Sequence, residues 1–187
     1  MSELSNLQGA LERVGAQFPV LAQRVHDAPL AYLDNAATTQ MPQSVLTAMN
    51  SFEQHDRANI HRGVHTLSQR ATDAYENART SVKGYVGADS SHELIFTSGT
   101  TEALNLVAQG LSVSDEAPAV IRPGDEIIVS GLEHHANLVP WQQAARRSGA
   151  SLRILMPDAE GQVHARDLKA LLSPRTRVFA LTACSNA

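Results

Sequence analysis

Three short apolar runs that alternate with helical segments constrain the fold of the second half of this chain most strongly. The runs predict strands at Glu126 to Val129, Leu152 to Leu155 and Arg177 to Leu181. Between them, apolar residues recur at the three- and four-residue spacing of helices near Leu138 to Arg147 and Ala165 to Leu172. Apolar strands that alternate with helices are typical of an α/β fold, with a predominantly parallel sheet and flanking helices on both faces.

The first half of the chain is predicted to be mainly helical. Its pattern predicts helices over residues 3–17, from Pro42 through Phe52 and up to about residue 85, and strands over Leu30–Leu33 and Leu94–Phe96. The segment HDRANIHRGVHTLS, before the third helix, is polar and irregular. The length suits one sizeable core, or one domain and a fraction.

The composition argues against several classes of function. The formal net charge of the 187 residues is −4, so neither nucleic acid nor an anionic membrane surface is an expected partner. No apolar run approaches the roughly 20 residues of a membrane span, and the N-terminus lacks the pattern of a secretory signal. The single cysteine, Cys184, excludes an internal disulfide and fits a reducing compartment. We therefore expect a soluble cytoplasmic protein.

The turn after the strand predicted at residues 94–96 has two interpretations. Gly99, Thr100 and Thr101 stand where the strand turns into a helix, and a glycine there would allow a tight turn. The N–H groups of a first helical turn lack partners, so two hydroxyls beside them make a site for a phosphate. Threonines are also common helix caps, and Glu102 suits the helix dipole without any ligand. Both readings stay open on these residues alone.

Two further strand ends are unusually polar. SGLEHHANLVPW follows Val129, and TACSNA follows Leu181. Ligands of parallel sheets bind outside the carboxyl ends of the strands. We therefore expect three strand ends to place candidate ligand groups on one rim of the sheet.

The histidines do not predict a metal site. His134 and His135 are adjacent, and neighbouring residues of an extended segment point to opposite faces. His61 and His65 have a spacing of four, but no helical pattern covers them and no carboxylate lies between them. On the residues alone, His134 and His135 are read as one packed and one solvated loop residue.

Five motifs together resemble one known family. YLDNAATTQMP, NIHRGVHTLSQRAT, FTSGTTEALNLVA, PGDEIIVSGLEHHANLVPWQ and SNA occur in the order seen in cysteine desulfurases of the SufS/CsdA-type branch. These are pyridoxal-phosphate (PLP) enzymes of the class V aminotransferase superfamily, and the resemblance runs from about Phe18 to Ala187. It implies the fold type I of PLP-dependent transferases. Residues 1–33 would form an N-terminal helix and lead-in segment of the small domain, and 34–187 the first part of the PLP-binding large domain, which is incomplete here.

The resemblance also implies roles for four residues at the strand ends. Thr100 and Thr101 would hold the cofactor phosphate, which favours the anion-site interpretation of the turn. His134 would stack on the pyridoxal ring and transfer protons, tasks that suit a flat group titrating near neutrality. Asn186 would donate a hydrogen bond to the phenolic oxygen of the cofactor.

Two residues of the polar connection are implied to border the substrate pocket. His61 and Arg62 match the HR pair of the family, and an arginine can pair with a substrate carboxylate through two hydrogen bonds. A surface ion pair is the alternative for Arg62. Cys184 precedes the family's later cysteine loop, so we interpret it as a packed structural thiol and not as the sulfur nucleophile.

The implied activity needs groups that these motifs do not supply. They are a Schiff-base lysine, an aspartate for the pyridinium nitrogen and a nucleophilic cysteine; Lys83 and Lys169 match no family motif. We expect this chain to be inactive alone and to be the N-terminal part of a homodimeric desulfurase. That enzyme would convert L-cysteine to L-alanine and pass sulfur, through an enzyme cysteine persulfide, to an acceptor protein for iron–sulfur cluster assembly. The alternatives are a selenocysteine lyase-like class V enzyme and a non-catalytic truncated remnant that acts by protein binding.

Overall fold

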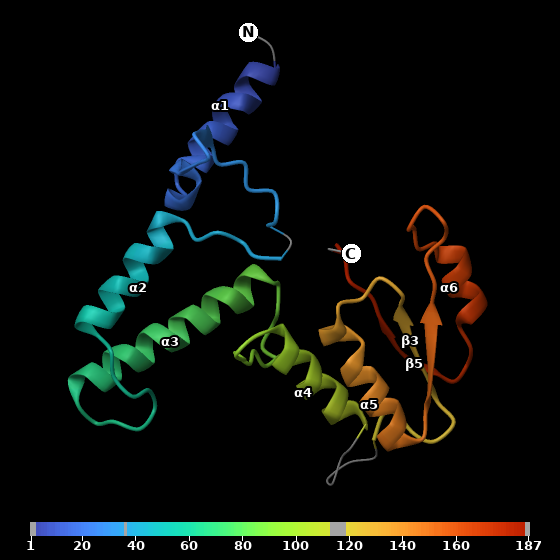
Figure 1. Cartoon of the computed structure of the whole chain (residues 1–187). Coiled ribbons are helices and arrows are strands. Elements are labelled where there is room, and N and C mark those ends of the chain that lie inside the picture. The colour runs from blue at the N-terminus through green and yellow to red at the C-terminus, as the bar shows by residue number, and fades with distance from the viewer. Residues whose placement is uncertain (1–2, 36, 113–118, 186–187) are drawn as a thin grey trace. The chain divides into compact units, whose positions relative to one another are not determined.

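The chain folds into two compact units, residues 1–95 and 96–187. A computed structural model describes residues 3–35, 37–112 and 119–185 (Figure 1). Within these ranges, no helix is long and apolar enough to cross a membrane. The expected assignment of residues 1–33 and 34–187 to a small and a large domain stays a prediction.

The first unit is mainly helical, as predicted. Its elements are α1 (Glu3–Gly15), the 3-10 helix η1 (Pro19–Ala22), β1 (Arg24–Val25), β2 (Ala28–Pro29), α2 (Gln43–His55) and α3 (Thr66–Tyr85). Pro42 stands at the N-cap of α2, where a missing N–H costs nothing. The apolar side chains of α2 remain largely uncovered, and Met49 is 53% exposed. These helices therefore follow from local sequence pattern more than from a core of their own.

The strand predicted at Leu30–Leu33 is wrong. The preceding residues form a tight antiparallel hairpin, in which Arg24 pairs with Pro29 and Val25 with Ala28. Each strand of this hairpin is two residues long, and the chain after it is irregular backbone in which Leu33 is 91% exposed. A strand needs a neighbouring strand to bond to, and the apolar pattern alone could not show that none follows.

The second unit contains the predicted parallel α/β arrangement. Its elements are α4 (Thr100–Ser112), β3 (Glu126–Ser130), the 3-10 helix η2 (His135–Asn137), α5 (Val139–Ser148), β4 (Ser151–Leu155), α6 (Ala165–Leu171) and β5 (Thr176–Ala180). The strands are ordered β4-β3-β5, and β3 pairs in parallel with both neighbours. All three strands predicted between residues 126 and 181 are confirmed, and the expected α/β fold with a parallel sheet is confirmed with them.

The core of this unit lies between the sheet and the helices α4 and α5. Ile127 and Val129 of β3 pack there with Trp141 of α5 and Ala108 of α4, and all four are buried. Side chains alternate along a strand, so Ile128 points to the opposite face, on whose side α6 lies (Figure 1). Helices therefore flank both faces of the sheet, which leaves its carboxyl edge to carry polar groups.

The strand predicted at Leu94–Phe96 is also wrong. These residues are irregular, and Ile95 is 66% exposed. The carbonyl of Leu94 accepts a hydrogen bond from the guanidinium of Arg79, where a strand would offer that carbonyl to a neighbour. An apolar run cannot reveal whether a partner strand is present to complete it.

Candidate functional site

The carboxyl ends of β3 and β5 meet at one edge of the sheet. Val129 and Ala180 are direct neighbours across the two strands. The loop after β3 and the segment after β5 are joined there by two hydrogen bonds. The backbone N–H of Thr182 donates to Glu133 Oε1 (2.7 Å), and the hydroxyl of Ser185 donates to the carbonyl of Leu132 (2.8 Å). Two of the three polar segments expected on one rim therefore do meet.

His134 is held at the start of η2 with its ring exposed. Its Nδ1 accepts a hydrogen bond from the backbone N–H of Ala136 (3.1 Å), so the ring caps the short helix. With Nδ1 used as an acceptor, a neutral ring carries its proton on Nε2. The ring of His135 lies edge-on at a centroid distance of 6.2 Å. Both histidines are exposed, so the expectation of one packed and one solvated ring is wrong.

A shallow pocket of about 340 Å³ brings His134 together with the first turn of α4. It is lined by Thr101 and Asn105 of α4, His134, His135 and Ala136 at η2, and Val139 and Pro140 of α5. Thr101 and His134 are 33 positions apart in the sequence, and the structure places both on one cavity. Thr100 is the first residue of α4 and is exposed beside Thr101.

The glycine before α4 is not explained by backbone strain. Gly99 does not adopt the left-handed conformation, and a Cβ built on it meets no atom within 4 Å. The turn therefore does not use the conformational freedom that a glycine would allow. The open space beside Gly99 lies at the N-terminus of α4, where Ala103 N–H donates the helical bond to Gly99 O (3.1 Å). An anion can approach the N–H groups before Ala103 at that place.

The first turn of α4 also contains a capping contact, as the interpretation of this turn as a plain helix cap expects. Glu102 Oε2 accepts hydrogen bonds from the hydroxyl and the backbone N–H of Ser98, both at 2.6 Å. The hydroxyl of Ser98, followed by its N–H, lowers the pKa of Glu102. The helix start thus has a built-in carboxylate cap at Ser98, which does not use the hydroxyls of Thr100 and Thr101.

His61 and Arg62 lie in the first unit, in the polar connection before α3. His61 has a left-handed φ of +61°. It is held there by Thr72 Oγ1, which accepts from its backbone N–H (3.0 Å), and by Glu76 Oε1, 3.2 Å from its Nε2. Arg62 is exposed and forms no ion pair with an acidic side chain in the described ranges. Among the described residues, Arg62 therefore does not form the surface ion pair considered for it.

Buried Ser68 fixes the backbone of this connection. Its hydroxyl donates to Asn59 O (2.6 Å) and accepts from the N–H of Gly63 (3.1 Å). A Cβ on Gly63 would come within 2.5 Å of Ser68 Cβ, so only glycine fits. The shape of the HRG segment is thus set by α3.

The remaining predicted residues have different outcomes. Asn186 lies outside the described residues. Cys184 is exposed after the end of β5, so the interpretation as a packed thiol is wrong. Lys83 donates to His92 O (2.6 Å). Sequence reasoning missed Glu133, whose two oxygens join separate segments, and only its place inside the EHH motif could have drawn attention to it.

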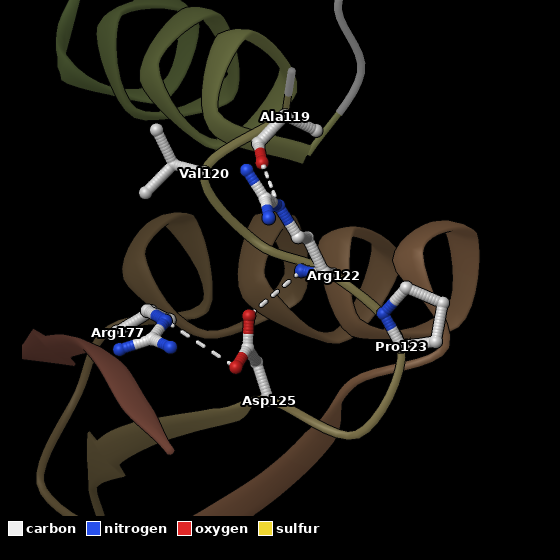
Figure 2. Close-up of a pocket in the computed structure, with 6 residues that line it drawn as sticks. All are labelled: Ala119, Val120, Arg122, Pro123, Asp125 and Arg177. Atoms are coloured by element: carbon white, nitrogen blue, oxygen red, sulfur yellow. Dashed lines mark hydrogen bonds and ion pairs between the residues drawn. The ribbon is translucent and has the colours of Figure 1, made fainter. Parts of the chain in front are cut away.

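A second cavity, of about 480 Å³, opens at the amino end of β3 (Figure 2). Its charged side chains are paired with their neighbours. Asp125 Oδ1 lies 3.3 Å from Arg177 Nε, and Asp125 Oδ2 accepts from the backbone N–H of Arg122 (2.9 Å). The carboxylate ties the turn before β3 to β5, which explains these charges structurally. The pocket at the carboxyl edge is therefore the candidate functional site.

The chain is similar in sequence to proteins named cysteine desulfurase. The chain is 45% identical over 177 residues to a cysteine desulfurase of Synechococcus elongatus, and 46% identical over 176 residues to one of an Enterobacter species. These matches cover 95% and 94% of this chain, but only 28% and 42% of the relatives. The chain thus spans less than half the length of these relatives.

Two solved structures of similar fold are also cysteine desulfurases. The chain superimposes on the apo cysteine desulfurase of Thermococcus onnurineus with a TM-score of 0.78 at 36% identity, over 94% of this chain and 40% of that one. It superimposes on the cysteine desulfurase CsdA of Escherichia coli with a TM-score of 0.68 at 38% identity, over 90% and 40%. The family model for class V aminotransferases matches residues 31–187. The chain belongs to the class V aminotransferase family.

Proposed function

We propose that this chain forms part of a PLP-dependent cysteine desulfurase. That enzyme would convert L-cysteine to L-alanine and transfer the sulfur to one of its own cysteines as a persulfide. Relatives at about 45% identity over nearly the whole chain bear the name cysteine desulfurase. The observation that carries the proposal is the pocket that Thr101 and His134 share, two residues which the family motifs assign to one cofactor.

The start of α4 suits the phosphate end of the cofactor. The hydroxyls of Thr100 and Thr101 are exposed, the space beside Gly99 is open, and the positive end of the helix dipole favours a dianion. Glu102 is the one acidic group in this turn, and its carboxylate is directed to Ser98. We propose that Thr100 and Thr101 bind the phosphate with their hydroxyl and backbone donors.

His134 suits the ring end of the same cofactor. When bound, PLP supplies an electron sink for the electron pair left at the Cα of the amino acid. The exposed imidazole of His134 offers a flat face for stacking, and its Nε2 can hold or release a proton. We propose that Asn186 donates a hydrogen bond to the phenolic oxygen of the cofactor. His61 and Arg62 are proposed to border the substrate pocket, where Arg62 would pair with the carboxylate of the substrate.

Two required groups do not line the pocket. The only lysines in the 187 residues are Lys83 and Lys169, and neither lies with Thr101 and His134 in the cavity. Cys184 does not line it either. The proposal therefore assigns the cofactor-binding lysine, the ring-nitrogen aspartate and the nucleophilic cysteine to other residues of a longer protein. A homodimer, a sulfur-acceptor protein, a role in iron–sulfur cluster assembly and a cytoplasmic location belong to the same proposal.

No lysine lines this pocket, and that observation motivates one alternative of another class. A chain without a Schiff-base lysine would be a non-catalytic module that acts by binding protein. A selenocysteine lyase-like activity is the nearest enzymatic alternative. Product analysis separates the three. The protein from the complete reading frame containing this sequence, supplied with PLP, should release alanine from L-cysteine in the presence of a thiol reductant. Alanine from L-selenocysteine alone would indicate the lyase, and no turnover of either substrate would indicate the binding module.

A further inference from the structure

The carboxylate of Glu133 joins two segments of the candidate site. Glu133 is half-buried in the loop between β3 and η2. Its Oε1 accepts from the backbone N–H of Thr182, after β5, and its Oε2 accepts from the side-chain amide of Asn137, in η2; both distances are 2.7 Å. Each oxygen of the carboxylate therefore holds a different segment.

The partners of Glu133 leave no choice of side chain. The indole of Trp141, which is 4% exposed, donates to Asn137 Oδ1 (2.9 Å). An indole N–H can only donate, so the amide oxygen of Asn137 is used there and its NH₂ group must face Glu133. Thr182 also presents a donor. Position 133 therefore needs two acceptors, which a carboxylate provides and a glutamine does not.

The hydrogen bonds of Glu133 lie next to the residue proposed to act on the cofactor. His134 follows Glu133 directly, and its orientation is marked by the bond from Ala136 N–H to its Nδ1. Leu132, on the other side, accepts from Ser185 in the segment after β5. The loop that carries His134 is thus tied to the segment after β5 at two consecutive residues, Leu132 and Glu133.

We infer that Glu133 is a positioning residue, which holds His134 in place by fixing its loop to the segment after β5 and to α5. The inference rests on the proposed function for its catalytic consequence. Glu133 touches neither cofactor nor substrate in this account, and it acts only through the loop.

A pair of substitutions tests this link. In Glu133→Gln, the NH₂ group of the glutamine faces either the N–H donor of Thr182 or the NH₂ donor of Asn137, whichever way the amide is turned. Adding Asn137→Asp should repair the fault. The introduced glutamine would then accept from Thr182 and donate to the new carboxylate, which would still accept from Trp141. Glu160→Gln, on an exposed turn of the same unit, is the matched control.

The first readout is hydrogen exchange, which needs no enzymatic activity. Exchange of the Thr182 and Ala136 amides and of the Trp141 indole should be about 10-fold faster in Glu133→Gln, from the loss of one hydrogen bond to a charged group. The double variant should return to the wild-type rates. Unchanged exchange in Glu133→Gln would overturn the inference, and so would faster exchange confined to Thr182 with Ala136 unaffected.

The second readout is turnover of the complete, cofactor-loaded enzyme. Turnover should fall about 10- to 100-fold in Glu133→Gln from misplacement of His134, and it should recover in the double variant. Recovered exchange without recovered turnover would show that Glu133 acts directly and would overturn the positioning role. A wild-type enzyme without turnover would refute the proposed function, while the exchange rates would still decide whether Glu133 holds His134.

Discussion

The Nδ1 atom of His134 accepts a hydrogen bond from the backbone N–H of Ala136, at a distance of 3.1 Å. This bond makes His134 the N-cap of η2 and leaves Nε2 as the nitrogen that carries the proton of a neutral ring. One side chain thus combines a structural contact with the proposed proton transfer. The two contributions are separable by substitution.

Replacing His134 by alanine should slow turnover of the complete enzyme by roughly 10²–10⁴-fold, the usual contribution of a positioned acid or base. Asparagine is the matched variant, because its amide oxygen can still cap the N–H of Ala136. We expect His134→Asn to be as slow as His134→Ala but to unfold at the wild-type temperature. A His134→Asn enzyme with wild-type turnover would remove proton transfer from the role of this residue.

Replacing both Thr100 and Thr101 by alanine should weaken cofactor binding. Each hydroxyl bonded to a charged phosphate contributes about 1.5–3 kcal/mol, so the affinity for PLP should fall by about two orders of magnitude or more. The backbone donors and the dipole of α4 remain, so binding should not vanish. Thr66→Ala, at the first residue of α3, is the control and should leave the dissociation constant unchanged. An unaltered dissociation constant for PLP in the double variant would show that the two threonines do not bind the phosphate and only belong to the start of the helix.

Gly63→Ala should destabilise the first unit. The new methyl group would stand within 2.5 Å of Ser68 Cβ, and Ser68 is fully buried and bonded on both sides of the connection. Overpacking of this kind costs about 1–3 kcal/mol in the free energy of unfolding. Gly84→Ala is the matched control, because the helical position in α3 meets no atom within 4 Å and should gain about 0.5–1 kcal/mol. Denaturant unfolding of both variants measures the two effects, and equal stabilities would contradict the packing described for Ser68.

Glu126 should make the stability of the second unit depend on pH. Its carboxylate accepts from the hydroxyl of Ser173 (2.8 Å), and Arg153 lies 3.3 Å away. The bond from Ser173, above all, lowers the pKa of Glu126. A lowered folded-state pKa stabilises the fold above the unfolded-state value, and this stabilisation is lost as pH falls through the folded-state value.

The measurement is the thermal unfolding of the wild-type protein and Glu126→Gln over a range of pH. The two melting temperatures should differ most near pH 7 and converge below about pH 4, where an ordinary glutamate protonates. Glu160→Gln, an exposed glutamate without these contacts, should show no such convergence. A difference between wild type and Glu126→Gln that persists unchanged to pH 3 would show that the charge of Glu126 is not what stabilises the fold.

The success of sequence reasoning depended on how local each feature is. The helix α5 and the strand β3 follow from apolar spacing, and Ile127 and Val129 are buried as that spacing predicts. Leu94–Phe96 failed as a strand because pairing is decided by residues elsewhere in the chain. The contacts of Glu133 could not have been predicted from local pattern, since the N–H group that donates to it belongs to Thr182, 49 positions away. Thr101 and His134 were expected on one rim because each follows a predicted strand, and the pocket that they share supports that prediction although residues 94–96 form no strand.

The central claim is that the cofactor binds at the carboxyl edge of the sheet, and an experimental structure of the protein with PLP bound tests it most directly. We expect the phosphate to lie against Thr100 and Thr101 at the start of α4 and the pyridine ring against His134. The cavity at the amino end of β3 is the competing anion site, because Arg122 and Arg177 line it. Phosphate density beside those two arginines, with the first turn of α4 free of ligand, would contradict the account.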